Sequence, residues 1–234
     1  MKSFLNHVLS LISSSEMAWT CHGGTNDELV NNLKSKHLVN NEKAYNAMLA
    51  IDRKAFVLSE LSSSAYEDRP LPIGYDVTIS APHMHAMMLD QMAPYLGPDS
   101  TACDIGSGSG YIVACMGKMC KKAYGIEHIA PLVPRSIQAV KKFLPDDKFE
   151  IKVGDGRNGF PENAPYDVIH VGAAAQPSVI DTLLAQLKPN GLLIIPVEIS
   201  YDNQVLYAIT KDSNGKPIKK RVCDVMFVPL TSAP

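Results

Sequence analysis

The sequence predicts an α/β fold built on a doubly wound, mostly parallel sheet. After Ser100, short apolar segments alternate with segments whose apolar residues recur at helical spacing. A glycine-rich turn at residues 106–110 joins one apolar segment to a helical one. Alternating strands and helices are typical of a sheet with helices on its faces. The chain has 234 residues, 46% hydrophobic and 20% charged, a composition that indicates a folded globular protein rather than a disordered one.

Ahead of the sheet, residues 27–63 are expected to form a helical N-terminal part. Two short apolar runs have helical spacing there: Leu29, Val30 and Leu33, then Tyr45, Met48 and Leu49. Serines 62–64 and two nearby prolines predict an irregular connection after these helices. Pro82 is well placed to begin a further helix, because proline at the first helical position loses no hydrogen bond.

Seven strands are predicted for the sheet, at residues 101–105, 123–127, 149–153, 166–171, 192–197, 205–210 and 222–228. Helices are expected between them at 111–120, at 136–144 and from Pro177 to about Leu187, with Gly191 as the stop of the last one. The run at 192–197 is almost continuously apolar, as in a parallel strand covered on both faces. The last two strands flank Asn214 and Gly215, which predicts an antiparallel hairpin that closes the sheet.

Charge and cysteine content exclude several classes of protein. A net charge of −2 lacks the basic balance of a dedicated nucleic-acid binder. The five cysteines include no Cys-x-x-Cys pair, so neither a zinc ribbon nor a disulfide scaffold is indicated, and a reducing compartment is expected. No apolar run reaches the length needed to span a bilayer. We therefore expect a cytoplasmic monomer without nucleic-acid or membrane partners.

Residues 1–16 are expected to be a flexible extension of this domain. Their apolar run is short and interrupted by Asn6 and His7. The alternative is a signal that directs the protein to the secretory route, but a clear cleavage site is missing and the positive region is thin.

The glycine-rich turn, Asp104-Ile105-Gly106-Ser107-Gly108-Ser109-Gly110, predicts a cofactor site. Glycine lets a backbone turn approach a ligand where a Cβ would collide with it. The nicotinamide-dinucleotide fingerprint would need glycine at the position of Tyr111, so an oxidoreductase fits poorly. An acidic residue before the turn suits a ligand that carries ammonium or hydroxyl donors.

Two further acidic residues follow the next two predicted strands. Glu127 ends the second strand, where a carboxylate can accept hydrogen bonds from both ribose hydroxyls. Asp155 follows the third strand and could meet an adenine amino group. Ligands of such sheets bind at the carboxyl ends of the strands. The three acids and the turn together therefore predict a site for a nucleoside-bearing cofactor.

At these residues the chain resembles the class I S-adenosylmethionine-dependent methyltransferases. Other segments narrow the resemblance to the protein-L-isoaspartate (D-aspartate) O-methyltransferase family: Met17–Trp19, Met48–Arg53, Thr78–Ala86, Gly154–Arg157, Tyr166–Ala175 and Val228–Thr231. The resemblance implies one Rossmann-like methyltransferase domain over residues 17–234, with the α/β cofactor-binding core at 100–234.

The same resemblance implies the reaction. A methyl group would pass from S-adenosyl-L-methionine to the α-carboxyl of L-isoaspartyl residues, and of D-aspartyl residues, in damaged proteins and peptides. The ester would then collapse to a succinimide and revert in part to normal aspartyl residues.

Ser80 is implied as the catalytic residue, with the task of orienting the substrate carboxylate. An α-carboxyl has a pKa of about 3.3–3.7 and is already anionic at neutral pH, so a strong general base would add nothing. No Gly-x-Ser-x-Gly surrounds Ser80, which argues against a covalent nucleophile. The N-terminus of the helix that begins at Pro82 is expected to offer free N–H groups to the carboxylate.

The remaining site residues are also carried over from the family. Implied cofactor contacts surround the turn, the strand ends and the segment before Pro82: Val77, Thr78, Ile79, Ser80, His85, Asp104, Gly106, Ser107, Gly108, Ser109, Gly110, Glu127, His128, Asp155, Gly156 and Thr231. Implied substrate contacts are Thr78, Ile79, Ser80, His85 and Val228. No metal is expected, and His83 is interpreted as structural.

Two other functions remain open at this point. One is a non-catalytic module that binds isoaspartate, and the short chain end after Val-Pro-Leu-Thr counts against it. The other is methylation of a different acceptor, such as RNA or a small molecule. The absence of a basic stripe and of an Asn-Pro-Pro-Tyr-like motif counts against nucleic acid or an amide nitrogen as the acceptor.

Overall fold

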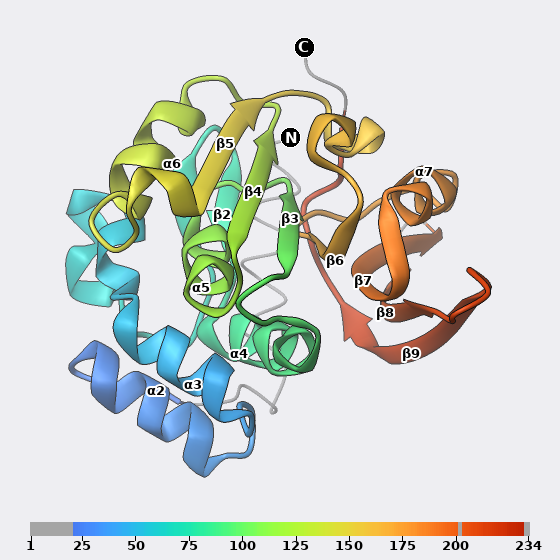
Figure 1. The fold of residues 1–234 in the computed structure, drawn as a ribbon. Coiled ribbons are helices and arrows are strands. Elements are labelled where there is room, and N and C mark those ends of the chain that lie inside the picture. The colour runs from blue at the N-terminus through green and yellow to red at the C-terminus, as the bar shows by residue number, and fades with distance from the viewer. Residues whose placement is uncertain (1–20, 201–202, 232–234) are drawn as a thin grey trace.

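The computed structural model describes residues 21–200 and 203–231. Its centre is a seven-stranded sheet with the order β5-β4-β3-β6-β7-β8-β9 (Figure 1). The strands are β3 (Thr101–Ile105), β4 (Lys122–Glu127), β5 (Phe149–Val153), β6 (Tyr166–Val171), β7 (Leu187–Ser200), β8 (Asn203–Lys211) and β9 (Pro217–Val225). The pairs from β5 to β7 are parallel, and β8 and β9 add antiparallel. The predicted fold class is confirmed.

Helices cover both faces of this sheet. One apolar core joins one face to α2 (Asn26–Ser35), α3 (Glu42–Ala50), α4 (Pro82–Met92), α5 (Tyr111–Met119) and α6 (Leu132–Val140). A second core on the opposite face includes α7 (Val179–Ala185). In β3 the side chains alternate between the two, with Ala102 in the first core and Cys103 in the second.

The N-terminal part is helical, as predicted. Thr25 caps α2 by accepting a hydrogen bond from the Glu28 N–H at 3.2 Å, and Asn41 caps α3 in the same way. Short 3₁₀ turns complete the connections: η1 (Arg53–Phe56), η2 (Ser59–Ser64), η3 (Ala93–Tyr95), η4 (Asp146–Lys148), η5 (Gly156–Asn158) and η6 (Pro161–Asn163). Residues 1–16 lie outside the described part of the chain.

A small hairpin, β1 (Leu71–Gly74) and β2 (Val77–Ile79), replaces part of the predicted irregular connection. Tyr75 and Asp76 form its tip with φ angles of 56° and 57°, a left-handed conformation that non-glycine residues seldom adopt. Such short strands with prolines carry no alternating pattern that the sequence could reveal. The hairpin feeds directly into α4, which begins at Pro82 as predicted.

Several predicted boundaries are wrong. Helix α7 ends at Ala185, and both Leu187 and Gly191 belong to β7, where a Cβ on Gly191 would lie 2.9 Å from the Asp167 carbonyl oxygen. Helix α6 begins at Leu132 rather than at Ser136. Strand β9 begins at Pro217, five residues before the predicted start at residue 222. The Asp212 carboxylate accepts hydrogen bonds from the N–H groups of Asn214 and Lys216, so the turn is complete before Pro217.

The end of the chain leaves the sheet after β9 and returns to the centre of the molecule. The Ala174 N–H donates to the Val228 carbonyl at 2.8 Å, and the Leu230 N–H donates to the Ala174 carbonyl at 2.7 Å. The predicted strand at 222–228 therefore includes the end of β9, up to Val225, and the start of the returning segment. This return places Val228 near the segment that follows β6.

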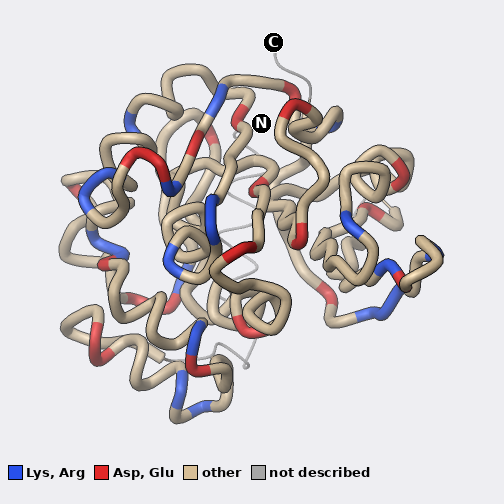
Figure 2. Tube along the Cα trace, viewed as in Figure 1, with Lys and Arg blue, Asp and Glu red and all other residues tan. Residues whose placement is uncertain are grey.

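Both signs of charge are interspersed along most of the chain in Figure 2. The longest basic run is Lys219–Arg221 on β9.

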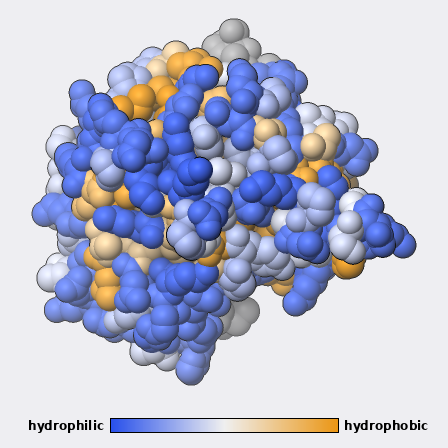
Figure 3. Space-filling model, viewed as in Figure 1, coloured by the Kyte–Doolittle hydropathy of each residue, from blue (hydrophilic) through white to orange (hydrophobic). Residues whose placement is uncertain are grey.

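Figure 3 shows a mostly hydrophilic face on which hydrophobic residues form small, separate patches. Among residues 21–200 and 203–231, no helix combines the length and the apolar character that a membrane span requires.

Candidate active site

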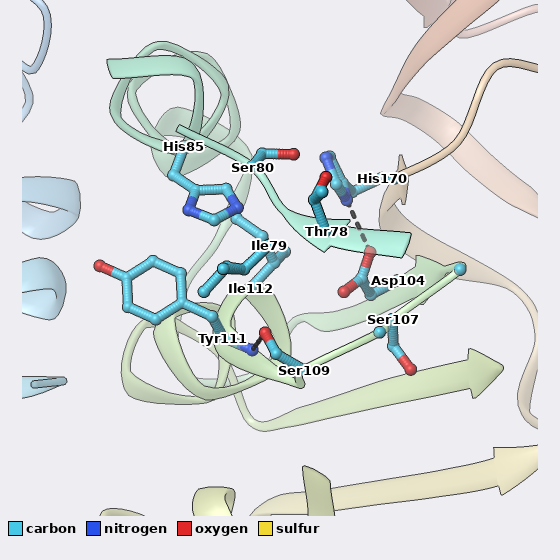
Figure 4. Close-up of a pocket in the computed structure, with 13 residues that line it drawn as sticks. Thr78, Ile79, Ser80, His85, Asp104, Ser107, Ser109, Tyr111, Ile112 and His170 are labelled. Atoms are coloured by element: carbon cyan, nitrogen blue, oxygen red, sulfur yellow. Dashed lines mark hydrogen bonds and ion pairs between the residues drawn. The ribbon is translucent and has the colours of Figure 1, made fainter. Parts of the chain in front are cut away.

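A pocket opens where the strand order reverses direction, between the carboxyl ends of β3 and β6 (Figure 4). This is the position at which open α/β sheets bind ligands. The hairpin strand β2, the start of α4 and the start of α5 close it from the other side. The lining residues are Thr78, Ile79, Ser80, His85, Asp104, Gly106, Ser107, Gly108, Ser109, Tyr111, Ile112, His170 and Gly172.

The glycine-rich turn forms the floor of the pocket. The N–H groups of Gly106 and Ser107 both donate to the Ile126 carbonyl, at 2.9 and 3.1 Å, which ties the turn to β4. Gly110 has a φ of 85° and starts α5, and a Cβ there would lie 3.0 Å from Val140. The turn therefore needs glycine both for its conformation and for its packing against α6.

Among the described residues that line the pocket, Asp104 alone carries a carboxylate. Its Oδ1 lies 2.6 Å from Nδ1 of His170, and both side chains are buried. The two residues are register partners on β3 and β6, and Nε2 of His170 lies 3.1 Å from the Met88 sulfur. Within the described chain, Oδ2 of Asp104 has no hydrogen-bond partner. Figure 4 shows this oxygen turned toward the pocket, where it can accept a hydrogen bond from a ligand.

Glu127 lies beside the turn and does not line the pocket. Its Oε2 accepts a hydrogen bond from the Gly108 N–H at 2.8 Å, and its Oε1 accepts one from the Ile129 N–H at 2.9 Å. Each carboxylate oxygen keeps a second lone pair for a further donor. Nδ1 of His128 lies 3.8 Å from Oε1. The carboxylate thus holds the turn and can still accept hydroxyl groups.

Asp155 follows β5 and is held by Arg157. The Arg157 Nε lies 3.0 and 3.1 Å from the two carboxylate oxygens, and its Nη2 lies 2.6 Å from Oδ2. The hydrogen bonds from Arg157 lower the pKa of Asp155. Gly156 packs below, where a Cβ would lie 2.6 Å from the Ile105 side chain. Neither Asp155 nor Gly156 lines the pocket.

The hairpin side of the pocket presents two hydroxyl groups. Thr78 and Ser80 both line the pocket, and in the described part of the chain neither hydroxyl has a hydrogen-bond partner. Val77, at the start of β2, pairs with Gly74 and does not line the pocket. Ile79 adds an apolar side chain to the lining, and Figure 4 shows it next to Ile112.

The expectation of free N–H groups at the start of α4 is wrong. Pro82 has none, and the His83 N–H donates to Oδ1 of Asp68 at 2.9 Å. The N–H groups of Met84 and His85 both donate to the Ala81 carbonyl. Since Asp68 caps this helix with a negative charge, the donors available to a ligand here are side chains.

His85 is 5% exposed and stacks on Tyr111, with ring centroids 4.8 Å apart. Its pKa lies well below the ordinary value of about 6.5, first because of burial and second because of the Arg53 charge. The ring is therefore neutral at physiological pH. His83, by contrast, faces Asp68 and not the pocket, in agreement with a structural role.

The structure brings most predicted residues together and leaves a few apart. Thr231 is exposed, the Val228 carbonyl accepts a hydrogen bond from the Ala174 N–H, and neither residue lines the pocket. Sequence reasoning missed His170, Tyr111 and Arg53. His170 could have been found from the predicted strands, because it is the last but one residue of β6 just as Asp104 is the last but one of β3. Within the described residues, no group of three or more His, Cys, Asp or Glu side chains could hold a metal ion.

The residues of the pocket fit a nucleoside cofactor with an ammonium group. The turn leaves a floor without Cβ atoms at Gly106 and Gly108, and Asp104 offers one free oxygen. Glu127 offers carboxylate lone pairs at the next strand end. The Asp104 carboxylate can therefore accept from the ammonium group of an amino-acid moiety, and the Glu127 carboxylate from the hydroxyl groups of a ribose.

Comparison with known proteins gives one consistent result. Residues 24–234 match the family model described as protein-L-isoaspartate(D-aspartate) O-methyltransferase. The chain is 45% identical to protein-L-isoaspartate O-methyltransferase 1 of Arabidopsis thaliana, over 88% of this chain and 91% of that protein. It is 44% identical to the Caenorhabditis elegans protein-L-isoaspartate O-methyltransferase, over 92% of this chain and 96% of the relative.

A solved structure agrees with these relatives. The protein-L-isoaspartate O-methyltransferase of Plasmodium falciparum, in complex with S-adenosyl-L-homocysteine, is 38% identical and superposes with a TM-score of 0.78. The match covers 89% of this chain and 99% of the other.

Proposed function

This chain belongs to the protein-L-isoaspartate (D-aspartate) O-methyltransferase family, and we propose that it methylates the α-carboxylate of L-isoaspartyl residues in damaged proteins and peptides. The single observation that carries the proposal is that one pocket contains both groups that can bind the cofactor and hydroxyl groups that can bind the substrate carboxylate. The free oxygen of Asp104 and the glycine-rich turn lie on one side, and the unpaired hydroxyls of Thr78 and Ser80 lie on the other.

The cofactor is S-adenosyl-L-methionine, which supplies a methyl group activated on a sulfonium centre. Asp104 accepts a hydrogen bond from its ammonium group, and His170 keeps the Asp104 carboxylate in place. Glu127 accepts the ribose hydroxyls while it holds Gly108. Asp155, fixed by Arg157, accepts the adenine amino group, with His128 and Gly156 beside it and Thr231 close to the cofactor.

Ser80 orients the substrate carboxylate. The carboxylate is already an anion at neutral pH, so the site has to position it and exclude water rather than remove a proton. The hydroxyl of Ser80 donates to one carboxylate oxygen, and Thr78 and His85 lie within the same pocket. Ile79 and Val228 pair their backbone groups with the extended peptide. Once formed, the ester collapses to a succinimide that reverts in part to aspartyl.

We also propose that the protein acts as a monomer in the cytoplasm. All five cysteines are free, and four of them are buried, which suits a reducing compartment. The description of the family model, which includes D-aspartate, supports the further proposal that the same site accepts D-aspartyl residues.

Paired peptides test the proposed function. One peptide carries isoaspartate and the other aspartate at the same position, and base-labile methyl transfer from labelled S-adenosylmethionine is counted. Transfer to the isoaspartyl peptide alone is expected. Cofactor binding without transfer to either peptide would contradict the proposal and favour a different acceptor or a binding role.

A further inference from the structure

Arg53 is a fully buried cation behind the pocket. It is 1% exposed and is the largest fully buried side chain among the described residues. Within residues 21–200 and 203–231, no carboxylate lies within ion-pair distance of it. Burial lowers the pKa of Arg53 to about 10, which leaves the guanidinium charged at neutral pH. A buried charge without a paired carboxylate is costly, so its retention calls for a reason.

Three contacts fix the guanidinium. Its Nε donates to the Ala65 carbonyl at 3.1 Å, and its Nη2 lies 3.5 Å from the Arg69 carbonyl. Its Nη1 lies 3.3 Å from Nδ1 of His85. The Arg53 backbone is also held, because its N–H donates to the buried Asn26 side chain at 3.2 Å.

The contact with His85 determines where the imidazole proton lies. A guanidinium can only donate hydrogen bonds, so Nδ1 of His85 must accept. The neutral ring then carries its proton on Nε2. No group in the described chain accepts a hydrogen bond from Nε2, and His85 lines the pocket. The ring therefore presents an N–H donor to whatever enters.

Apart from the sulfonium that the cofactor brings, the described lining of the pocket offers an anionic substrate no permanently charged cation. None of the thirteen described residues that line it is a lysine or an arginine, and Asp104 is negative. The N–H groups in the first turn of α4 all have hydrogen-bond partners. The negative charge of Asp68 also offsets the positive end of the helix dipole there. Arg53 lies directly behind His85 and is the cation in contact with the lining of the pocket.

We propose that Arg53 is a positioning residue for the substrate carboxylate: it fixes the His85 proton on Nε2 and places a positive charge behind the ring, so that His85 donates a charge-assisted hydrogen bond to the carboxylate. This rests on the proposed function. Arg53 touches neither substrate nor cofactor and acts through His85. The arrangement favours the anionic reactant over the neutral methyl ester, which assists release of the product.

The charges that face His85 come from several elements. Arg53 approaches from η1, Tyr111 from α5, and His170 from β6, while His83 precedes it on α4 and is paired with Asp68. Arg53, His170 and His83 all oppose protonation of the ring. Removal of Arg53 takes away the largest of these charge effects, so the pKa of His85 rises.

Arg53→Gln tests the proposal, with Arg53→Lys as the conservative variant and Lys54→Gln, an exposed neighbour, as the matched control. We expect Arg53→Gln to raise the KM for an isoaspartyl peptide by about tenfold, the range for loss of a charge-assisted hydrogen bond, without a change in the Kd of S-adenosylmethionine. Arg53→Lys should recover part of the loss, and Lys54→Gln should match the parent protein.

The pH profile separates a positioning role from a merely structural one. Because loss of Arg53 raises the pKa of His85, the ring in Arg53→Gln should gain a proton at a higher pH than in the parent protein, and the KM difference between the two should narrow as pH falls. An unchanged peptide KM, or an equal loss of peptide and cofactor binding, would overturn the proposal.

Nitrogen NMR of the unaltered protein provides a test that needs no variant. The ¹⁵N shifts of His85 should report a protonated Nε2 and an unprotonated Nδ1 at neutral pH. A proton on Nδ1 would overturn the inference even if isoaspartyl peptides are methylated. Conversely, an inactive protein with the Nε2–H form would contradict the proposed function and leave the Arg53–His85 arrangement intact.

Discussion

The two sides of the pocket are built by different means. The cofactor side, formed by Asp104, Gly106–Gly110 and His170, stands on the ends of two neighbouring parallel strands. The acceptor side, formed by Thr78, Ser80 and His85, stands on a short hairpin and a helix start. Sheet register places the first set, whereas contacts between distant segments place the second. The acceptor side therefore depends on buried polar residues far from the substrate, such as Asp68 and Arg53.

The largest expected effect lies on the cofactor side. Asp104→Asn removes the charge that faces the cofactor ammonium and leaves His170 without its carboxylate partner. Loss of a buried charged hydrogen bond of about 1.5–3 kcal/mol corresponds to a roughly 10- to 100-fold weaker Kd for S-adenosylmethionine. Isothermal titration measures this value. If the Kd stays within twofold while the fold is intact, Asp104 does not hold the cofactor.

Ser80→Ala should affect the acceptor side alone. Loss of one hydrogen bond to the anionic carboxylate, about 1.5 kcal/mol at the low end for charged groups, predicts roughly a tenfold fall in kcat/KM for an isoaspartyl peptide. The Kd of the cofactor should remain the same. Steady-state methyl transfer and cofactor titration on the same preparation measure both quantities. Equal losses in the two would show that Ser80 belongs to the cofactor side.

Asp68→Ala should destabilise the acceptor side from a distance. The buried Asp68 carboxylate accepts from both the backbone N–H and Nδ1 of His83, each at 2.9 Å, and so fixes the start of α4. Loss of these bonds predicts a decrease of about 1–3 kcal/mol in the free energy of unfolding, measured in urea. Asp146→Ala, which removes an exposed ion pair with Lys141, should change it by less than about 0.5 kcal/mol. Similar values for the two variants would contradict the assigned role of Asp68.

The smallest expected effect is a pH dependence of stability that arises from His85. Burial and Arg53 keep its pKa in the folded state well below about 6.5, the value for an unfolded chain. Below that pH the unfolded state binds a proton that the folded state does not, so stability is lost as pH falls. His85→Asn should therefore show a shallower loss of stability than the parent protein between about pH 7 and about pH 5. Parallel curves would mean that folding does not lower the pKa of His85.

Sequence patterns could predict the cofactor side because its signals are local. Strands 101–105, 149–153 and 166–171 match the structure residue for residue, and the glycine turn follows the first of them as predicted. The ends of α7 and β9 were less predictable, since a few contacts, such as those of Gly191 and Asp212, decide where each begins or stops.

The acceptor side was predictable only in part. The resemblance to the family indicated Ser80 and His85, but the hairpin that carries Thr78 has no strand pattern. Arg53 and His85 are far apart in sequence and meet through one side-chain contact. Nothing in the local pattern around Arg53 separates it from an exposed arginine, because its burial depends on the packing of η1 against α4 and α5.

Peptide binding to the protein saturated with S-adenosyl-L-homocysteine tests the central claim most directly, since it isolates the acceptor side from chemistry. Calorimetric titration would compare an isoaspartyl peptide with its aspartyl counterpart. We predict measurable binding of the isoaspartyl peptide and at least tenfold weaker binding of the other, about 1.4 kcal/mol of discrimination. Equal affinities would contradict the claim that Thr78, Ser80 and His85 select the isoaspartyl carboxylate.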